Sequence, residues 1–286
     1  MSTDPAARTA NPPEFEQAVE DYLEHARDQF NYEQMLLTFR SNERFHLWAG
    51  IVEHYRTLRG ATMLSSGCGF GGSLLAYRDA GAEVAVGVEV DDDFARFAAM
   101  RTSRLHGAGA VRYDGARLPF STASFDVIES MDVIEHTPDP LDYLRELARV
   151  LAPGGVVLLV TPNRLWPVEQ HLGFAGPPWL PVRVADALFA LLGRLPWLSK
   201  DRRFRYARLR GMRTQNVSLR RLQRLARQSG LFLRLVRPAD HAQSWPLPRQ
   251  GTWVERMLDH RLGKFFAPTR TIVTVLTRTG DAPPHR

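Results

Sequence analysis

Three glycines follow a short apolar run that ends near residue 65, and their spacing is typical of a loop that holds a nucleotide. Gly67, Gly69 and Gly71 allow sharp turns and let a ligand approach the main chain. The next apolar run, residues 84–88, ends in Glu89, whose carboxylate can accept hydrogen bonds from ribose hydroxyls. This order of elements predicts a nucleotide-type site: a strand, a glycine loop, a helix and a second strand that ends in an acid.

The glycines do not identify the nucleotide. Gly67, Gly69 and Gly72 also satisfy the G-x-G-x-x-G pattern, and Glu89 lies 22 residues after Gly67, which suits a dinucleotide fold. Four later motifs decide the matter: YDGARLPF at 113–120, SFDVIES at 124–130, VIEHTPDP at 133–140 and RVLAPGG at 149–155. Their order resembles that of class I S-adenosylmethionine (SAM)-dependent methyltransferases of type 11/23, over about residues 60–163. An NAD dehydrogenase would have no use for the EH.PDP and PGG segments.

The resemblance implies SAM as the cofactor and assigns residues to it. Glu89 would hold the ribose, the Asp114 carboxylate would meet the adenine amino group, and the Gly115 N–H would meet a ring nitrogen. The alternative for Asp114 is a turn-forming aspartate, and we favour the cofactor role. The remaining expected cofactor residues are the glycine loop and the ends of two strands: Ser65, Gly67, Cys68, Gly69, Gly71, Val90, Ser130 and Met131.

The chain departs from the family at Ser65. The family usually carries an acid there, which organises the loop and the methionine end of the cofactor, whereas serine can form hydrogen bonds but brings no charge. This departure keeps open a second class of function, a cofactor-binding or scaffold protein without turnover. Cys68 has no nearby base in the sequence, so we interpret it as a small residue packed under the loop.

Methyl transfer to a hydroxyl needs an aligned nucleophile and a base that takes its proton. His136, just after the fourth strand, is the first candidate base, and His171 in a later insertion is the second. Bracing of the loop before Pro138 is the structural alternative for His136. We expect no metal site, but Asp132 and Glu135 form an alternative that would hold Mg²⁺, as acids at matching places do in similar quinone-type O-methyltransferases.

Hydrophobic periodicity predicts how these residues are positioned. Strands are expected near 61–65, 84–89, 109–113, 124–130, 155–161, 231–236 and 271–277, and helices near 71–80, 92–105, 140–151, 218–229 and 252–263. Alternation of strand and helix predicts an α/β fold. We expect a Rossmann-like, mostly parallel, seven-stranded sheet with helices on both faces.

The organisation along the chain has six predicted parts. Three helices in 14–59 would form an N-terminal cap, 60–163 the SAM-binding core, 164–217 an acceptor lid inserted after the fifth strand, and 218–278 the rest of the core. The ends, 1–13 and 279–286, are expected to be disordered. The beginning of the chain lacks the apolar stretch of a signal peptide.

Charge and cysteine content bear on partners and location. Residues 181–227 carry 13 Lys/Arg and two acids, a net +11, whereas the remainder carries −5. This predicts an anionic partner or, equally, a solvated arginine-rich face. The apolar stretch at 182–198 beside the arginines suits a lid, a homodimer face or peripheral membrane contact. One cysteine excludes a disulfide framework and fits the cytoplasm.

The expected function is O-methylation of a hydroxyl on a sugar, saccharide or lipid-linked intermediate. The segments at 162–171 and 179–181 resemble methyltransferases of glycan and cell-envelope pathways, which favours that acceptor. A small aromatic or quinone hydroxyl is the first alternative, and the non-catalytic SAM-binding protein the second. Nucleic acid ranks last, because the chain carries no recognisable RNA-binding module.

Overall fold

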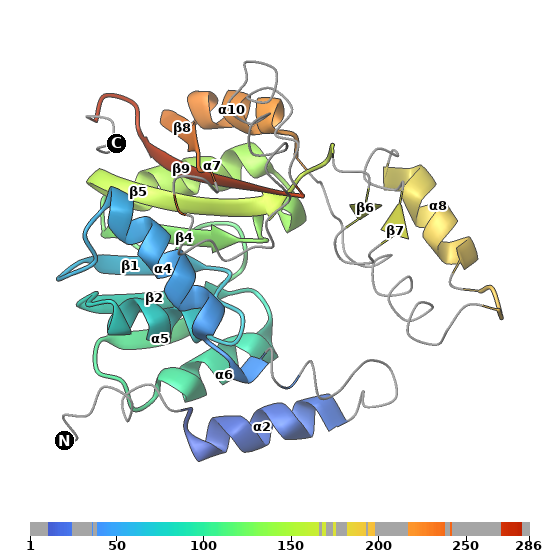
Figure 1. Ribbon diagram of the computed structural model, residues 1–286, viewed down its shortest axis with the longest axis horizontal. Coiled ribbons are helices and arrows are strands. Elements are labelled where there is room, and N and C mark those ends of the chain that lie inside the picture. Colours follow the sequence, from blue (N-terminus) through green and yellow to red (C-terminus); the bar gives the residue numbers. More distant parts are fainter. Residues whose placement is uncertain are drawn as a thin grey trace.

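The computed structural model describes residues 11–24, 36, 39–165, 168–169, 174–175, 182–192, 194–197, 217–237, 241 and 270–281. Its core is a seven-stranded sheet (Figure 1). The strands are β1 (Thr62–Ser66), β2 (Val84–Glu89), β3 (Ala108–Arg112), β4 (Phe125–Met131), β5 (Leu151–Pro162), β8 (Leu231–Leu235) and β9 (Thr271–Arg278). Their order across the sheet is β3-β2-β1-β4-β5-β9-β8.

The first five strands are parallel, and β9 is antiparallel to both β5 and β8. This confirms the predicted Rossmann-like sheet. Strand β1 lies at the centre, where the order reverses between β2 and β4, and ligands of open α/β sheets bind at such a switch point. The apolar run at 156–160 is buried on both faces in β5, as its continuous hydrophobicity predicts.

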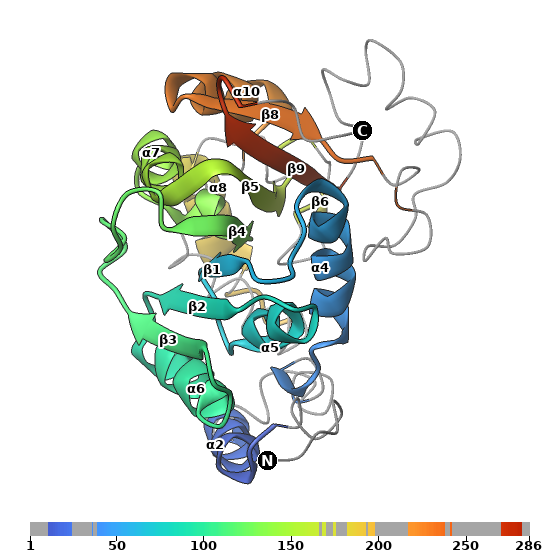
Figure 2. The ribbon, with the colours of Figure 1, turned by 90° about the vertical axis from the view of Figure 1, so that its left-hand side faces the viewer.

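Helices cover both faces of the sheet (Figure 2). Helices α4 (Glu43–Tyr55) and α5 (Gly72–Asp79) pack on one face, and α7 (Pro140–Val150) and α10 (Leu219–Gln228) on the other. Helix α6 (Asp92–Thr102) packs against β3 and β2, and α2 (Pro13–Glu24) packs outside α6. Two separate apolar cores result, one on each side of the sheet.

Two element boundaries show how the sequence sets the fold. Asp139 caps α7 by accepting hydrogen bonds from the Leu141 and Asp142 amides, with Pro140 in the first turn. Helix α7 ends at Val150, and β5 begins at once with Leu151. The Pro-Gly-Gly segment is therefore part of an irregular first section of β5, where the register with β4 shifts, and it does not itself end the helix.

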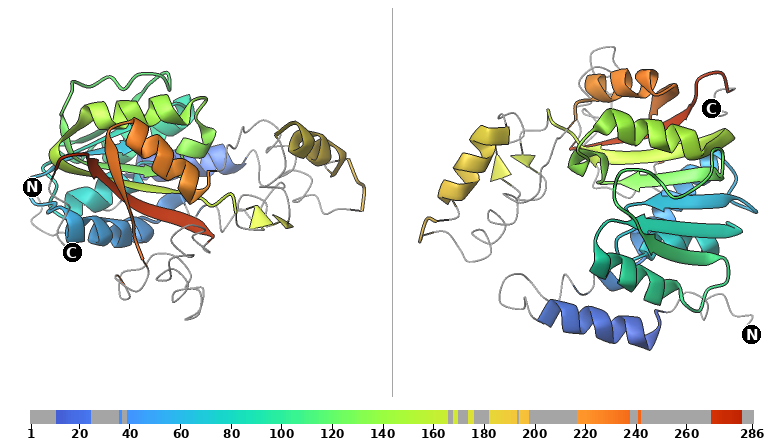
Figure 3. Two further views of the ribbon diagram at one scale, coloured as in Figure 1. Left: turned by 90° about the horizontal axis from the view of Figure 1, so that it is seen from above. Right: turned by 180° about the vertical axis from the view of Figure 1, so that it is seen from behind.

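The inserted and terminal segments are described only in part. Beyond the end of β5 lie a two-stranded ribbon, β6 (Val168–Glu169) and β7 (Phe174–Ala175), and helix α8 (Val182–Leu192), which stand away from the sheet (Figure 3). Among the described residues, no helix is long and apolar enough to cross a membrane. The predicted helix at 252–263 and most of the second of the three predicted N-terminal helices lie outside the described residues.

Candidate active site

The glycine loop after β1 has the backbone conformation that its sequence predicts. Gly67, Gly69 and Gly71 have φ values of 78°, 50° and 73°, in the left-handed region that favours glycine. A Cβ atom at Gly67 would lie 2.4 Å from Val133 Cγ2, so that position must stay bare for packing. At Gly69 a Cβ would meet nothing within 4 Å. The loop is therefore tightly packed at Gly67 and open at Gly69, where a ligand can approach.

Glu89 lies at the end of β2, as predicted, and its carboxylate is largely buried. Oε2 accepts a hydrogen bond from the Gly69 N–H (2.8 Å), and Oε1 accepts one from the Val90 N–H (2.8 Å). The acid thus ties the glycine loop to the β2–α6 turn. Oε1 also accepts a longer hydrogen bond from the Asp91 N–H (3.3 Å), whereas Oε2 can accept a second one, so Glu89 holds the loop and still has acceptor capacity for a ribose hydroxyl.

Asp114 and Gly115 lie two and three residues after β3, beside the same edge of the sheet. Asp114 Oδ1 accepts a hydrogen bond from the Ala116 N–H (2.9 Å), and this bond lowers the pKa of the exposed carboxyl. The side chain therefore holds a turn through Oδ1, which is the alternative role considered for this residue. Gly115 has a φ of 80°, and a Cβ there would lie 3.3 Å from Val90 Cγ1. The fold thus brings Val90 and Gly115 together, as a shared cofactor wall requires.

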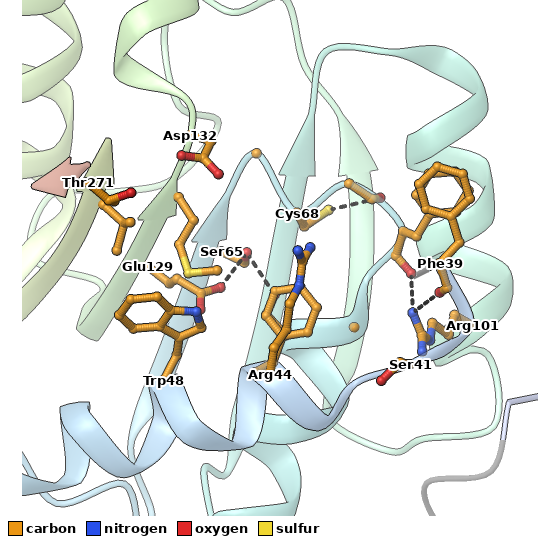
Figure 4. Close-up of a pocket in the computed structure, with 18 residues that line it drawn as sticks. Phe39, Ser41, Arg44, Trp48, Ser65, Cys68, Arg101, Glu129, Asp132 and Thr271 are labelled. Atoms are coloured by element: carbon orange, nitrogen blue, oxygen red, sulfur yellow. Dashed lines mark hydrogen bonds between the residues drawn. The ribbon is translucent and has the colours of Figure 1, made fainter. Parts of the chain in front are cut away.

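A cavity of about 340 Å³ adjoins the glycine loop on the side of α4 (Figure 4). Of the predicted residues, Ser65, Gly67, Cys68, Gly69, Met131 and Asp132 line it. Burial strongly raises the pKa of the Cys68 thiol, and the nearby Glu89 charge adds to the effect, so the thiol is not an activated nucleophile. The cavity also has walls that sequence reasoning missed: Phe39, Arg44, Phe45, Trp48 and Glu129.

Glu129 is the most important of the missed residues. It lies in the middle of β4, is 2% exposed, and pairs in register with Ser65 on β1. The Ser73 hydroxyl donates to Ser65 Oγ (3.0 Å), which donates to Glu129 Oε2 (3.2 Å). Burial raises the pKa of Glu129 to about 7, although these hydroxyls and Arg44 favour the charged form. An acid directly after the apolar pair Val127 and Ile128, within the buried part of the strand, was the available sequence signal.

Ser130 faces the other way. Its side chain is fully buried, and its hydroxyl shares a hydrogen bond with Tyr143 Oη (2.8 Å), which in turn donates to Ser66 Oγ (2.9 Å). This network joins β4, α7 and β1 on the side of the sheet opposite Glu129. The predicted cofactor role of Ser130 is therefore open only to its backbone.

The segment after β4 carries Asp132, Glu135 and His136, and the side chains of these residues lie in different surroundings. Asp132 has a φ of 54° and lines the cavity, whereas Glu135 is fully buried and accepts a hydrogen bond from Thr161 Oγ1 (3.0 Å). His136 ends the short 3₁₀ helix η1 (Ile134–His136) and is partly buried. Among the described residues, no group of three His, Cys, Asp or Glu side chains could hold a metal ion. His171 lies outside the described residues.

Comparisons with known proteins agree with this geometry. Residues 64–159 match the model of a family described as "Methyltransferase domain". The chain is 38% identical over 120 residues to the tRNA U34 carboxymethyltransferase of Edwardsiella ictaluri, which covers 40% of this chain and 36% of that protein. It is 31% identical over 117 residues to the chloroplastic tocopherol O-methyltransferase of Arabidopsis thaliana (40% and 34%). These matches thus span about a third of each relative.

A longer match includes more of the chain. An uncharacterized methyltransferase of Mycobacterium tuberculosis is 32% identical over 178 residues, covering 59% of this chain and 65% of that protein. The solved structure of a SAM-dependent methyltransferase from Mesorhizobium loti has the same fold, with a TM-score of 0.53 and 16% identity over 82% of this chain and 98% of that one. Residues 64–159, with the sheet order and the glycine loop around them, are therefore similar to the SAM-dependent methyltransferases of class I.

Proposed function

We propose that the protein transfers a methyl group from SAM to a hydroxyl of a sugar, saccharide or lipid-linked acceptor. The observation that carries the transferase part is the juxtaposition of the open loop at Gly69, the Glu89 carboxylate and a cavity of about 340 Å³. SAM supplies a methyl group on a sulfonium, which is electrophilic without help from the protein. The chain must therefore orient the two reactants and take up the acceptor proton.

The residues of the site fit that division of labour. Glu89 would hold the ribose, and the wall of Val90 and Gly115 would enclose the adenine. The aromatic side chains of Phe39, Phe45 and Trp48 give the cavity an apolar wall that excludes water from the reacting groups. In calorimetric titrations, SAM and its demethylated product S-adenosylhomocysteine should bind with a measurable heat, and NAD should not. Binding of NAD without binding of SAM would contradict the proposal.

The mechanism also needs a base that takes the proton of the acceptor hydroxyl. His136 follows β4 directly and is our first candidate, with His171 in the insertion as the second. Asp132 and Glu135 would have to act together in the Mg²⁺ alternative, yet Glu135 already bonds Thr161. A histidine base near its ordinary pKa gives a rate that rises through about pH 6.5.

Single-turnover methylation distinguishes these mechanisms. With labelled SAM and a saccharide acceptor, we expect His136→Ala or His171→Ala to remove the rise through about pH 6.5, and a chelator to change little. The histidine mechanism is wrong if both variants keep near-normal rates while a chelator abolishes activity and Mg²⁺ restores it. That result would support the metal mechanism.

The acceptor class needs a direct comparison. The segments at 162–171 and 179–181 favour a glycan or lipid-linked hydroxyl, and the basic segment at 181–227 suits an anionic one. The similarity to a tRNA-modifying enzyme favours RNA as a second candidate, although it covers only 40% of this chain. A labelled-methyl screen of saccharides, lipid-linked saccharides, quinol precursors and bulk tRNA separates these classes. Label in tRNA alone would overturn the glycan proposal.

A further inference from the structure

One oxygen of Glu129 lacks a partner. Oε2 accepts from Ser65 Oγ, but Oε1 is buried and has no hydrogen-bond partner among the described residues. A buried polar atom without a partner costs free energy, more so when the group is charged. Glu129 also lines the cavity beside the glycine loop. A buried acid with free acceptor capacity at a cavity wall indicates a site for a cationic or donor group of a ligand.

The opposite charge comes from α4. Arg44 lines the same cavity, and its guanidinium lies 4.6 Å from the centroid of the Phe45 ring. Figure 4 shows Arg44 and Glu129 at the cavity on different elements, with the hydroxyl of Ser65 on β1 bonded to Glu129. Asp132 and Arg101 also line the cavity, but Arg101 already donates to Asn11 Oδ1 and to the carbonyls of Phe39 and Arg40. A cavity that presents both carboxylate and guanidinium groups is complementary to a zwitterion. The amino-acid end of SAM carries that pair of charges, an α-ammonium and a carboxylate.

We propose that Glu129 binds the α-ammonium group of the cofactor and that Arg44 binds its carboxylate. This inference rests on the proposed function and assigns the amino-acid end of the same site. Because Ser65 and Glu129 are lateral neighbours in register, a carboxylate from either strand reaches the same space. Strand β4 thus provides the negative charge that β1 lacks at Ser65.

The charge on Glu129 is linked to binding. Four other groups face or adjoin this carboxylate: Arg44 from α4, Tyr77 from α5, Cys68 from the glycine loop and Asp132 from the segment after β4. Burial raises the pKa of Glu129 to about 7, so at pH 6 most of the ligand-free protein carries a neutral acid there. A bound ammonium favours the ionised form, so affinity rises with pH between 6 and 7.5.

Tyr77 offers the competing explanation. Its hydroxyl is buried and has no hydrogen-bond partner in the described part of the chain, and burial, then the Glu129 charge, raises its pKa. In that explanation, Glu129 has only a structural role: its carboxyl interacts with Tyr77 and binds no ligand. Tyr77→Phe therefore serves as the matched control, because it removes this neighbour and leaves the cavity charges in place.

The test compares two probes, S-adenosylhomocysteine and 5′-methylthioadenosine, which lacks the amino-acid end. We expect Glu129→Gln and Arg44→Gln each to weaken S-adenosylhomocysteine roughly 10- to 100-fold and to leave 5′-methylthioadenosine unchanged. Tyr77→Phe should change neither. Wild-type affinity for S-adenosylhomocysteine should rise roughly eightfold from pH 6 to 7.5, below the ammonium pKa of about 8, and that of Glu129→Gln should stay flat.

Moving the carboxylate from residue 129 on β4 to residue 65 on β1 tests whether the two positions reach the same space. The double variant Ser65→Asp/Glu129→Gln should regain most of the lost S-adenosylhomocysteine affinity, and no recovery in the folded double variant would overturn the shared position. Unchanged affinity in Glu129→Gln, or an equal loss for both probes, would overturn the ammonium assignment. If the wild-type protein binds neither SAM nor S-adenosylhomocysteine, the proposed function fails first and the inference falls with it.

Discussion

Glu89 on β2 and Glu129 on β4 are two buried acids on the strands that flank β1, and their hydrogen-bond donors differ. Glu89 accepts hydrogen bonds from the Gly69 and Val90 amides. Glu129 receives only hydroxyl donors and has its pKa raised to about 7 by burial. The first acid therefore ties the glycine loop to the β2–α6 turn, whereas the second changes charge within the physiological range.

Replacement of Glu89 tests the ribose assignment. Glu89→Ala should weaken SAM binding by roughly 1.5–3 kcal/mol, because charge-assisted hydrogen bonds to the ribose and to the Gly69 amide are both lost. Calorimetry measures this change. Asp92→Ala is the control, since this acid lies near the same edge but pairs with Arg112 in an exposed position. Equal SAM affinity in wild type and a folded Glu89→Ala would refute the role.

Glu129 should also set the pH dependence of stability in the ligand-free protein. Its pKa is 4.5 when unperturbed and about 7 in the folded chain, so the unfolded chain releases this proton first. Stability is therefore lost as pH rises from about 4.5 to 7, by roughly 3 kcal/mol in all. Urea unfolding of Glu129→Gln should show higher stability than wild type at pH 8 and little difference at pH 4.5. A constant difference across that range would contradict the raised pKa.

At the scale of elements, the three glycines of the loop are required for different reasons. Gly67 packs against Val133 of the segment after β4, and Gly71 approaches Ala98 of α6, where a Cβ would lie 3.1 Å away. Gly69 faces open space and donates its amide to Glu89. The loop thus connects β1 to β2, β4 and α6 through its outer glycines and leaves its middle one for the ligand.

Two alanine substitutions separate these demands. Gly67→Ala should destabilise the protein by roughly 2–5 kcal/mol, because left-handed strain adds to a clash with Val133. Gly69→Ala should cost only the strain, roughly 1–2 kcal/mol, yet weaken SAM binding by narrowing the approach. Urea unfolding and calorimetry measure the two effects. Equal destabilisation by both variants would mean that the Val133 contact does not decide the loop.

The regular elements could be predicted from the sequence, and the cavity could not. The predicted strand at 84–89 matches β2, because a buried parallel strand is a compact apolar run between turn residues. The loop glycines and Glu89 followed from spacing within one segment. Arg44, Trp48 and Glu129 come from α4 and β4, and only tertiary packing brings them beside Ser65. Ser130 shows the converse, since strand alternation turns its side chain away from the cavity.

At the scale of the whole molecule, the basic excess and the cofactor site lie on different segments. The net +11 of residues 181–227 falls after the SAM-binding core. Helix α10 carries part of it on an exposed face, with Leu219, Leu222 and Ala226 buried underneath. An anionic acceptor would therefore meet the arginines without disturbing the glycine loop.

This separation predicts a division in the kinetics. Replacement of Arg202, Arg203 and Arg205 with serine should raise the acceptor KM and leave SAM affinity unchanged, because the charges attract the acceptor alone. The control removes the same charge from α10 by replacing Arg220, Arg224 and Arg227. Steady-state rates and calorimetry check both triple variants. Unchanged turnover and binding in the first variant would make the 202–205 cluster a solvated face.

The place of β9 in the sheet has a consequence for how the chain reaches this fold. Strand β9 lies between β5 and β8, and its Thr274 hydroxyl bonds the carbonyl of Leu159, 115 residues earlier. Until β9 inserts, β5 keeps an open edge and β8 has no strand beside it among the described residues. Contacts between such distant residues form slowly, because a long loop must close before they form. Any partly folded chain in which β9 has not yet paired would therefore expose the edge of β5 to edge-to-edge aggregation, and a chaperone that shields β5 would act on that chain.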